Sequence, residues 1–383
     1  MRRDRWRRKA LAHLEMTRPY TVFYAGLVTV AAAELASGGR AALWRVALAA
    51  LVTMCGWVAG LYAGDYYDRE IDAQSKPFRP VPSGRVSPRE ALLTMAGLIL
   101  AGYIGALVLG VANLALAVVT TALGIAYSKT FKDRAILGNF DRGVLGICAV
   151  LFGALAGGNP FTWDTLAWTV PLLAAVVLFH DSATNLVGAI RDVAGDGAAG
   201  CHTVPVVYGT RRAVAIACAL ALAWLAPAVA LLVLLRPGAL AVALFAAAMA
   251  LDILVYGRLW LARARVTRPA ALAAHKYLVV ERVVLMGAYI AVFSAPGAAL
   301  GLLAAVLVAT LGSQVLLRDR HEREGGAAHP PSGAQPASTA PVAGDAHPVG
   351  AAQDCATGRP RRRERHGELA AEGGSAGARE AAM

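Results

Sequence analysis

Long apolar blocks separated by short polar segments make up the chain as far as about residue 317. A helix needs about 20 predominantly apolar residues to cross a bilayer. The blocks that approach this length are residues 19–36, 42–63, 90–109, 111–127, 143–159, 167–190, 212–235, 238–260, 278–294 and 298–317. Sheets with open edges cannot span lipid, and the alternating pattern of a membrane barrel is absent. The sequence therefore predicts an all-α polytopic membrane protein with nine or ten transmembrane helices.

The polar segments between the blocks are of two kinds. Short segments that are poor in lysine and arginine lie near residues 37–41, 110, 160–166 and 236–237. Longer, basic segments lie near residues 64–89, 128–142, 191–212 and 261–282. Because basic loops tend to stay in the cytoplasm, we expect the longer segments and the N-terminus on that side of the membrane.

This pattern divides the chain into three regions. Residues 1–18 are basic and lack an apolar run, which indicates a cytoplasmic arm. Residues 19–317 hold all the apolar blocks and form the predicted membrane domain. Residues 318–383 are rich in alanine, glycine, proline and charge. Such a composition buries too little apolar surface to fold, so we expect a disordered tail.

The overall composition narrows the functional class. Of the 383 residues, 57% are hydrophobic and only 16% are charged, whereas soluble domains carry about 25% charged residues. A soluble enzyme is therefore not expected, and a disordered or fibrous chain is excluded. The formal net charge is +12, but the basic residues are spread over loops without a recognition motif, so nucleic-acid binding is not supported.

Aspartates are concentrated in two short windows of the predicted membrane domain. Six of the ten aspartates between residues 11 and 317 lie within 65–72 and 181–196. Asp68 and Asp72 are four residues apart, as are Asp192 and Asp196, so the members of each pair share one face of a helix. Acids near membrane depth are costly and are usually functional.

Each aspartate pair begins where an apolar block ends. Two carboxylates so placed repel each other unless a cation lies between them and a partner. Mg²⁺ fits because it prefers oxygen ligands and shares them with phosphates. Two such pairs on one face of the membrane could hold two Mg²⁺ ions around one diphosphate, with nearby arginine and lysine on its outer oxygens. A solvated helix end is the alternative for either window alone.

These windows resemble the signatures of a known family. The stretch Asp65 to Arg85 resembles NDxxDxxxD followed by KPxRPxPSGR, the first signature of the UbiA superfamily of intramembrane prenyltransferases. The stretch Asp192 to Pro205 resembles its second signature, DxxxD followed by GxxTxP. The resemblance covers residues 15–317. It implies a bundle of about nine transmembrane helices around a central cavity, and Mg²⁺-dependent transfer of an isoprenoid chain from an allylic diphosphate to an acceptor.

The resemblance also implies roles for individual residues. The catalytic, Mg²⁺-binding residues would be Asp68, Asp72, Asp192 and Asp196. The diphosphate-binding residues would be Arg79, Arg85, Lys129, Lys132, Arg191 and Tyr127. The sequence departs from the family pattern at Gly64 and Gly188, where the family usually has asparagine.

A further pair of polar residues, His180 and Asp181, lies inside an apolar block. The pair could face the cavity and help to deprotonate an acceptor or to stabilise a cation. The alternative is a hydrogen-bonded pair that packs two helices together.

Together these features predict an integral, multi-pass membrane prenyltransferase. Its partners would be a polyprenyl diphosphate donor, an aromatic or hydroxyl acceptor of quinone or lipid biosynthesis, and the bilayer. We expect a bacterial plasma membrane, with the two DxxxD motifs on the cytoplasmic side. One alternative is an intramembrane terpene cyclase on the same scaffold, and a more remote one is a transporter or lipid-binding protein.

Overall fold

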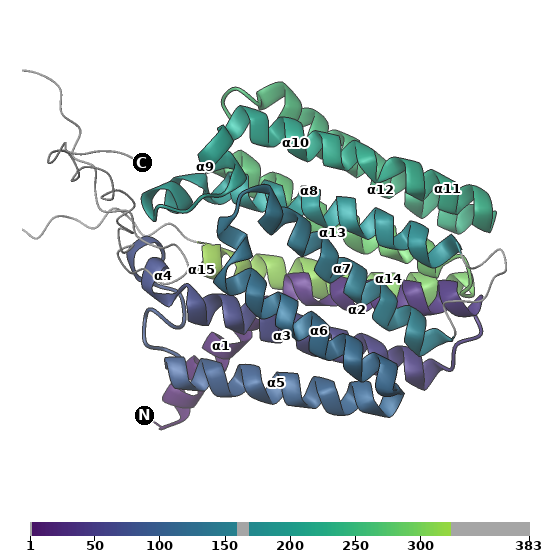
Figure 1. Ribbon diagram of the computed structural model, residues 1–383, viewed down its shortest axis with the longest axis horizontal. Helices are drawn as coiled ribbons and strands as arrows, with labels where there is room; N and C mark the ends of the chain where they lie inside the picture. Colours follow the sequence, from purple (N-terminus) through teal and green to yellow (C-terminus); the bar gives the residue numbers. More distant parts are fainter. Residues whose placement is uncertain (1, 159–167, 323–383) are drawn as a thin grey trace, which may run out of the picture.

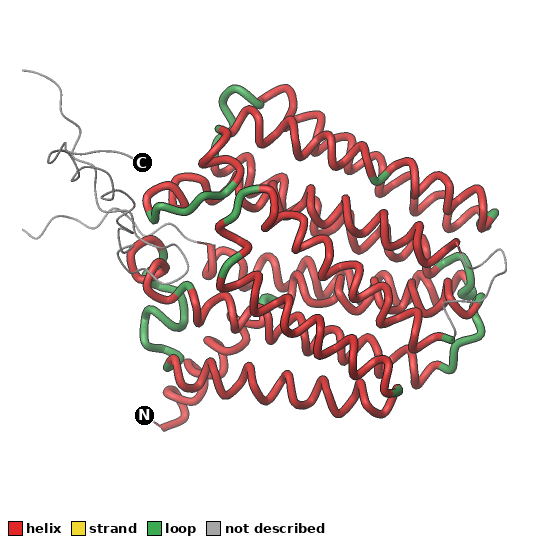
Figure 2. Tube along the Cα trace, in the orientation of Figure 1, coloured by secondary structure: helices red, strands yellow, loops and turns green. Residues whose placement is uncertain are grey.

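The computed structural model describes residues 2–158 and 168–322. The described residues form helices joined by loops, and Figure 2 shows no strand among them. The long helices lie side by side, with the short helices α4, α9 and α15 at one end of the bundle (Figure 1). The predicted all-α membrane fold is confirmed. The predicted disordered tail, residues 318–383, starts too early, because Arg318 ends η3 and Asp319–Glu322 form the helix α15. The rest of the predicted tail, from residue 323 onward, lies outside the described residues.

The helices follow one another with few intervening residues. In chain order they are α1 (Arg2–Thr17), α2 (Pro19–Ser37), α3 (Leu43–Tyr67), α4 (Arg69–Ser75), α5 (Pro88–Leu109), α6 (Val111–Lys129), η1 (Phe131–Asp133), α7 (Ile136–Gly157), α8 (Thr169–Ala198), α9 (Val204–Tyr208), α10 (Thr210–Ala223), α11 (Leu225–Leu235), α12 (Ala239–Ala262), α13 (Arg268–Ile290), α14 (Pro296–Ser313), the π-helical turn η3 (Gln314–Arg318) and α15 (Asp319–Glu322).

Within the described residues, nine stretches are long and apolar enough to cross a membrane. They are α2, α3, α5, α6, α7, α8, α10 with α11, α12, and α14 with η3. Helix α13 has 23 residues but carries the buried charged residues Glu281 and Arg282. It packs against α2, α8, α12 and α14. The described part of the bundle therefore contains nine apolar spans and one further long helix, α13, whose buried charged side chains are shielded by its neighbours.

Four predicted spans differ from the observed helices by more than four residues or by a break. Helix α7 begins at Ile136 instead of residue 143, and α13 begins at Arg268 instead of residue 278. Helix α8 continues to Ala198, eight residues beyond the predicted end at 190, because its polar last turns face other protein groups and need not be apolar. The predicted span 212–235 is divided at Trp224 into α10 and α11. Pro227 lies in the first turn of α11, where a missing backbone N–H costs no helical hydrogen bond.

Several helix starts are fixed by local sequence. Ser87 and Glu90 form a capping box at the start of α5, each side chain bonding the other residue's backbone N–H. Thr267 caps α13 by accepting from the N–H of Ala270. Prolines occupy the first turn of α2, α5, α13 and α14, where their fixed φ suits a helix start.

Helix α7 lies close to two neighbours because glycines face both of them. A Cβ at Gly146 would come within 2.5 Å of Val177 on α8. A Cβ at Gly153 or Gly157 would overlap the backbone of α2, coming within 2.8 Å of Ala33 Cα at Gly157. Small residues allow such close approach in membrane bundles, where lipid supplies no hydrophobic force between helices. These contacts fix α2, α7 and α8 around the cavity described below.

We predict that Gly153→Ala destabilises the protein, because its methyl group would meet the α2 backbone, which cannot rotate away. Overpacking of this kind costs about 1–3 kcal/mol. The control is Gly257→Ala on α12, where a Cβ meets nothing within 4 Å. Thermal unfolding in detergent should show a lower midpoint for Gly153→Ala alone. Equal midpoints for the two variants would contradict the close-packing account.

Candidate active site

A cavity of about 700 Å³ lies among the helices at the point where the two aspartate windows meet. Its volume is within the range of small-molecule sites. Its lining includes all four motif aspartates, Asp68, Asp72, Asp192 and Asp196, together with apolar side chains of α2, α3, α5, α6 and α7. One cavity therefore combines a charged region with an apolar region.

The first motif is positioned by the junction of α3 and α4. Asp68 lies between the two helices, and its carbonyl accepts from the N–H of Asp72 at 2.7 Å. The following loop turns back, so that Arg79 donates to Asp72 at 2.7 Å and lies 4.0 Å from Asp65. Burial alone would lower the pKa of Arg79, but these two carboxylates raise it. Arg79 therefore stays charged and holds the loop onto the motif.

The second motif lies on the last turns of α8 and faces the first. Asp192 accepts from Arg191 at 2.5 Å, and Lys76 of the first motif's loop donates to Asp192 at 3.4 Å. Asp196 accepts from the hydroxyl of Thr203 at 3.2 Å. The Lys76–Asp192 contact joins residues 116 positions apart. It places the two aspartate pairs across a single site.

The loop after α6 contributes another cation. Lys132, in η1, bonds to Asp68. Burial would lower the pKa of Lys132, but Asp68 raises it above its ordinary value, so the ammonium group stays charged. Tyr127, one of the expected diphosphate ligands, also lines the cavity.

Three other expected site residues do not line the cavity. Arg85 donates to both oxygens of Glu15, at 2.7 and 3.1 Å, and so ties the first motif's loop to α1. Lys129 lies over the ring of Tyr67, 5.1 Å from its centroid. His180 points to Glu281 rather than into the cavity. Its neighbour Asp181 does line the cavity.

The donor set fits a hard divalent cation. The four motif carboxylates line one cavity, and oxygen is the ligand type that Mg²⁺ prefers. The two departures from the family pattern, Gly64 and Gly188, remove none of these carboxylates. Both glycines line the cavity next to the motif aspartates. A Cβ at Gly64 meets nothing within 4 Å, and one at Gly188 meets only the His275 ring at 3.7 Å.

Some cavity residues were not anticipated from the sequence. Arg282 lies 3.6 Å from Asp181 and 4.4 Å above the ring of Tyr24, whose hydroxyl donates to Asp181 at 2.8 Å. Arg142 lies 4.0 Å above the ring of Trp57. The signal for both arginines was a charge at the edge of or inside an apolar block, which in a membrane usually marks a functional site.

Glu322, at the end of α15, also reaches the cavity. Its carboxylate accepts from Arg191 at 3.0 Å, and its carbonyl accepts from Arg268 at 2.7 Å. Burial would raise the pKa of Glu322, but Arg191 holds it below its ordinary value. The carboxylate of Glu322 therefore pairs with Arg191, which the family resemblance assigns to diphosphate binding.

The fold and the cavity together define a class of protein. A membrane-embedded cavity with paired carboxylates, surrounding cations and an apolar region suits an enzyme that acts on an apolar chain bearing a diphosphate. The model of the UbiA prenyltransferase family matches residues 25–276, and the chain belongs to that family. It is accordingly an integral, multi-pass membrane prenyltransferase.

Relatives with similar sequences carry a more specific name. The chain is 37% identical over 209 residues to the digeranylgeranylglyceryl phosphate synthase of Halobacterium salinarum, covering 53% of this chain and 71% of that protein. It is 33% identical over 202 residues to the synthase of the same name from Thermococcus kodakarensis, covering 53% and 70%.

Solved structures share the fold. A structure of a digeranylgeranylglyceryl phosphate synthase has a TM-score of 0.57 at 24% identity, covering 74% of this chain and 98% of that one. A UbiA homologue from Aeropyrum pernix has a TM-score of 0.58 at 24% identity, covering 68% and 96%. A UbiA homologue from Archaeoglobus fulgidus, bound to DMAPP and Mg²⁺, has a TM-score of 0.50 at 15% identity, covering 80% and 99%.

We predict that Glu322→Gln increases the affinity for inorganic pyrophosphate, because a competing negative charge leaves Arg191. We expect the affinity to rise severalfold. This is somewhat less than the tenfold change that corresponds to about 1.4 kcal/mol. Isothermal titration of the detergent-solubilised protein measures it. Glu34→Gln, an acid on α2 that does not line the cavity, is the control. Weaker binding to Glu322→Gln would show instead that Glu322 supports the site.

Proposed function

We propose that this prenyltransferase depends on Mg²⁺ and moves a polyprenyl group from an allylic diphosphate to a hydroxyl of a glycerophosphate-type acceptor. The observation that carries the proposal is the pairing of the two aspartate motifs across one cavity, bridged by Lys76 and Asp192 at 3.4 Å. Two carboxylate pairs surrounded by arginine and lysine have the charge pattern needed to hold a diphosphate together with divalent cations.

The residues of the charged region have separate tasks. The four motif aspartates would hold Mg²⁺, which when bound neutralises the diphosphate and makes it a better leaving group. Lys76, Arg79, Lys132 and Arg191 would bind the outer diphosphate oxygens, since all four line the cavity and their charge is placed where negative charge develops. Arg85 and Lys129 keep their expected diphosphate role only as predictions, and the proposal does not rely on them.

The reaction would proceed at the boundary between the charged and apolar regions. The allylic carbon–oxygen bond breaks, and the diphosphate leaves with the electron pair. The rings of Tyr24 and Trp57 line the cavity, and the ring faces that Arg282 and Arg142 do not cover can stabilise the allylic cation through cation–π contacts. The acceptor hydroxyl forms the new carbon–oxygen bond, and its proton passes to a base. Asp181 is a cavity carboxylate outside the two motifs and can serve as that base.

A phosphate on the acceptor is supported by cations that the diphosphate site does not need. Arg142 and Arg282 line the same cavity and lie on α7 and α13, outside the two motif loops in sequence. The relatives named digeranylgeranylglyceryl phosphate synthase favour a glycerophosphate acceptor over an aromatic ring. We further propose that the N-terminus and the motif loops face the cytoplasm, as the basic loops predict. A bacterial membrane stays a prediction, since the relatives named above come from archaea.

We predict that Asp68→Asn and Asp192→Asn each reduce turnover by at least ~10²-fold, the scale of losing one group that stabilises developing charge. The control is Glu70→Gln, which lies within the same motif and, in the described part of the chain, pairs with Arg69 at the surface. Pyrophosphate release from geranylgeranyl diphosphate measures the effect, with gel filtration as the check of folding. Near-normal turnover in both asparagine variants would exclude the assignment of the metal site.

The acceptor class can be decided by product analysis. We predict that geranylgeranyl diphosphate and Mg²⁺ give an ether product with an sn-glycerol phosphate bearing one prenyl chain. Little pyrophosphate should be released without this acceptor, or after EDTA treatment. Product formation only with an aromatic acceptor would contradict the glycerophosphate assignment. Cyclic hydrocarbon formed without an acceptor would identify a cyclase instead.

A further inference from the structure

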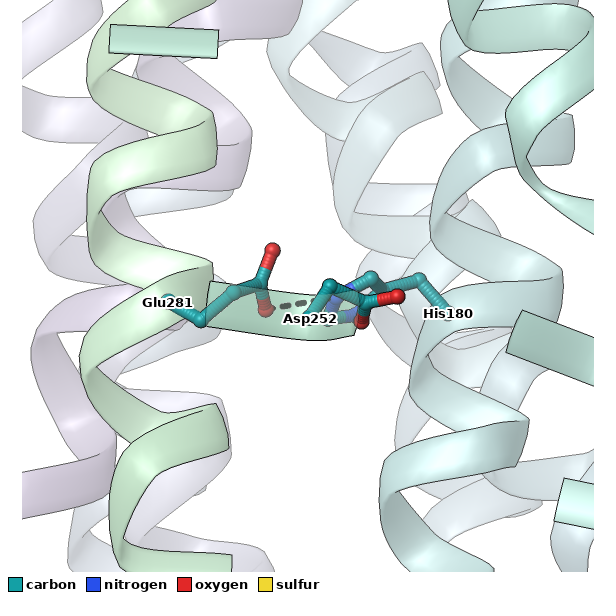
Figure 3. Close-up of side chains that lie close together, drawn as sticks. All are labelled: His180, Asp252 and Glu281. Atoms are coloured by element: carbon teal, nitrogen blue, oxygen red, sulfur yellow. Dashed lines mark hydrogen bonds and ion pairs between the residues drawn. The ribbon is translucent and has the colours of Figure 1, made fainter. Parts of the chain in front are cut away.

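A second group of ionisable side chains lies inside the bundle, apart from the aspartate motifs. It consists of His180 on α8, Asp252 on α12 and Glu281 on α13 (Figure 3). One ligand atom from each residue lies within 4.8 Å of the others. His180 Nε2 is 2.7 Å from Glu281 Oε2. Figure 3 shows His180 and Glu281 approaching from opposite sides, with Asp252 between them.

The group is buried and incompletely satisfied. The relative exposures of His180, Asp252 and Glu281 are 2%, 5% and 0%. Each residue has a buried polar atom without a hydrogen-bond partner, namely His180 Nδ1, Asp252 Oδ1 and Glu281 Oε1. Buried polar atoms are nearly always paired, and leaving one unpaired costs about 1–3 kcal/mol. The three neighbouring residues therefore have unpaired atoms that a bound ligand could complete.

The group is separate from the substrate cavity. None of its three residues lines that cavity, whereas the next residues along the chain, Asp181 and Arg282, do. Helices α8 and α13 thus present Asp181 and Arg282 to the cavity. Their neighbours His180 and Glu281 face the interior of the bundle, where they contact each other. The ring of Trp224, fully buried, packs edge-on against His180 with 5.4 Å between centroids.

With both carboxylates ionised, the group carries more negative charge than its histidine can balance. Within the described residues, the ion pair shown for these two carboxylates is that of Glu281 with His180. A protonated His180 would balance only one of the two carboxylates. A divalent cation would balance both and leave the imidazole neutral, as a metal ligand must be. Burying an uncompensated charge is costly, and a divalent ion would let both carboxylates stay ionised.

We infer that His180, Asp252 and Glu281 form a binding site for one divalent transition-metal ion of the Zn²⁺ class. Imidazole and carboxylate are both common zinc ligands, and three protein ligands with one open position are a frequent arrangement. Mg²⁺ is a weaker fit, since it binds oxygen ligands and keeps several waters. The ion would join α8, α12 and α13, and so fix the two helices that carry Asp192 and Arg282.

Zinc retention tests this inference directly. The full chain carrying Asp68→Asn and Asp192→Asn, which weakens the motif site, is stripped with EDTA, loaded with Zn²⁺ and desalted. Plasma mass spectrometry should find about one zinc per chain. Adding Glu281→Gln or Asp252→Asn should remove most of it. The matched control is Asp141→Asn, another membrane aspartate with an unpaired oxygen, which should keep the zinc.

A second readout needs no change within the group. Zn²⁺ should raise the thermal unfolding midpoint of the Asp68→Asn/Asp192→Asn protein, because a ligand that binds only the folded state stabilises it. EDTA should reverse the shift. Absence of both retained zinc and a shift would overturn the inference and leave a polar trio that shares protons. Zinc retained equally by Glu281→Gln and Asp252→Asn would overturn it as well, by placing the ion elsewhere.

Discussion

The structure depends on balancing negative charge inside a bundle that lipid surrounds. Carboxylates removed from water are costly unless they are paired. At the cavity each motif is paired through short contacts: Arg79 with Asp72 at 2.7 Å, and Arg191 with Asp192 at 2.5 Å. Lys76 then joins the second motif to the loop of the first. The cations that pair with these carboxylates are those that would bind a diphosphate, so the substrate would exchange one set of ion pairs for another.

The close helix packing gives these charges their geometry. Glycines on α7 bring α2 and α8 near enough that their backbones leave little room for movement. Helix α8 carries Asp181 toward the cavity and both second-motif aspartates near its end. A shift of this helix would change the distance between the two motifs. The helix packing at the centre of the bundle therefore sets the distance between the charged motifs at its end.

Some of this arrangement could be predicted from the sequence, and the reason is physical. Lipid demands long apolar segments, so the spans are visible in the hydrophobic pattern. The spacing of Asp68 and Asp72, and of Asp192 and Asp196, places each pair on one helix face without reference to tertiary structure. The predicted end of α8, at residue 190, was wrong. A polar helical turn that faces a protein cavity has the same kind of sequence as a polar turn that faces water.

Contacts between distant segments could not be predicted in the same way. Successive helix residues point about 100° apart, which separates His180 from Asp181, but a single sequence does not say which of the two faces the cavity. The meeting of His180, Asp252 and Glu281 depends on how three helices pack. The pairing of Arg85 with Glu15 likewise depends on where α1 lies.

Both aspartate pairs are proposed to bind one ligand, and a double-mutant cycle tests this proposal most directly. Mg²⁺-dependent binding of inorganic pyrophosphate would be measured for the wild type, Asp68→Asn, Asp192→Asn and the double variant. We expect the double variant to lose little more than either single variant, because the two motifs share one ligand. Strictly additive losses would mean that the two motifs act independently, which contradicts the account.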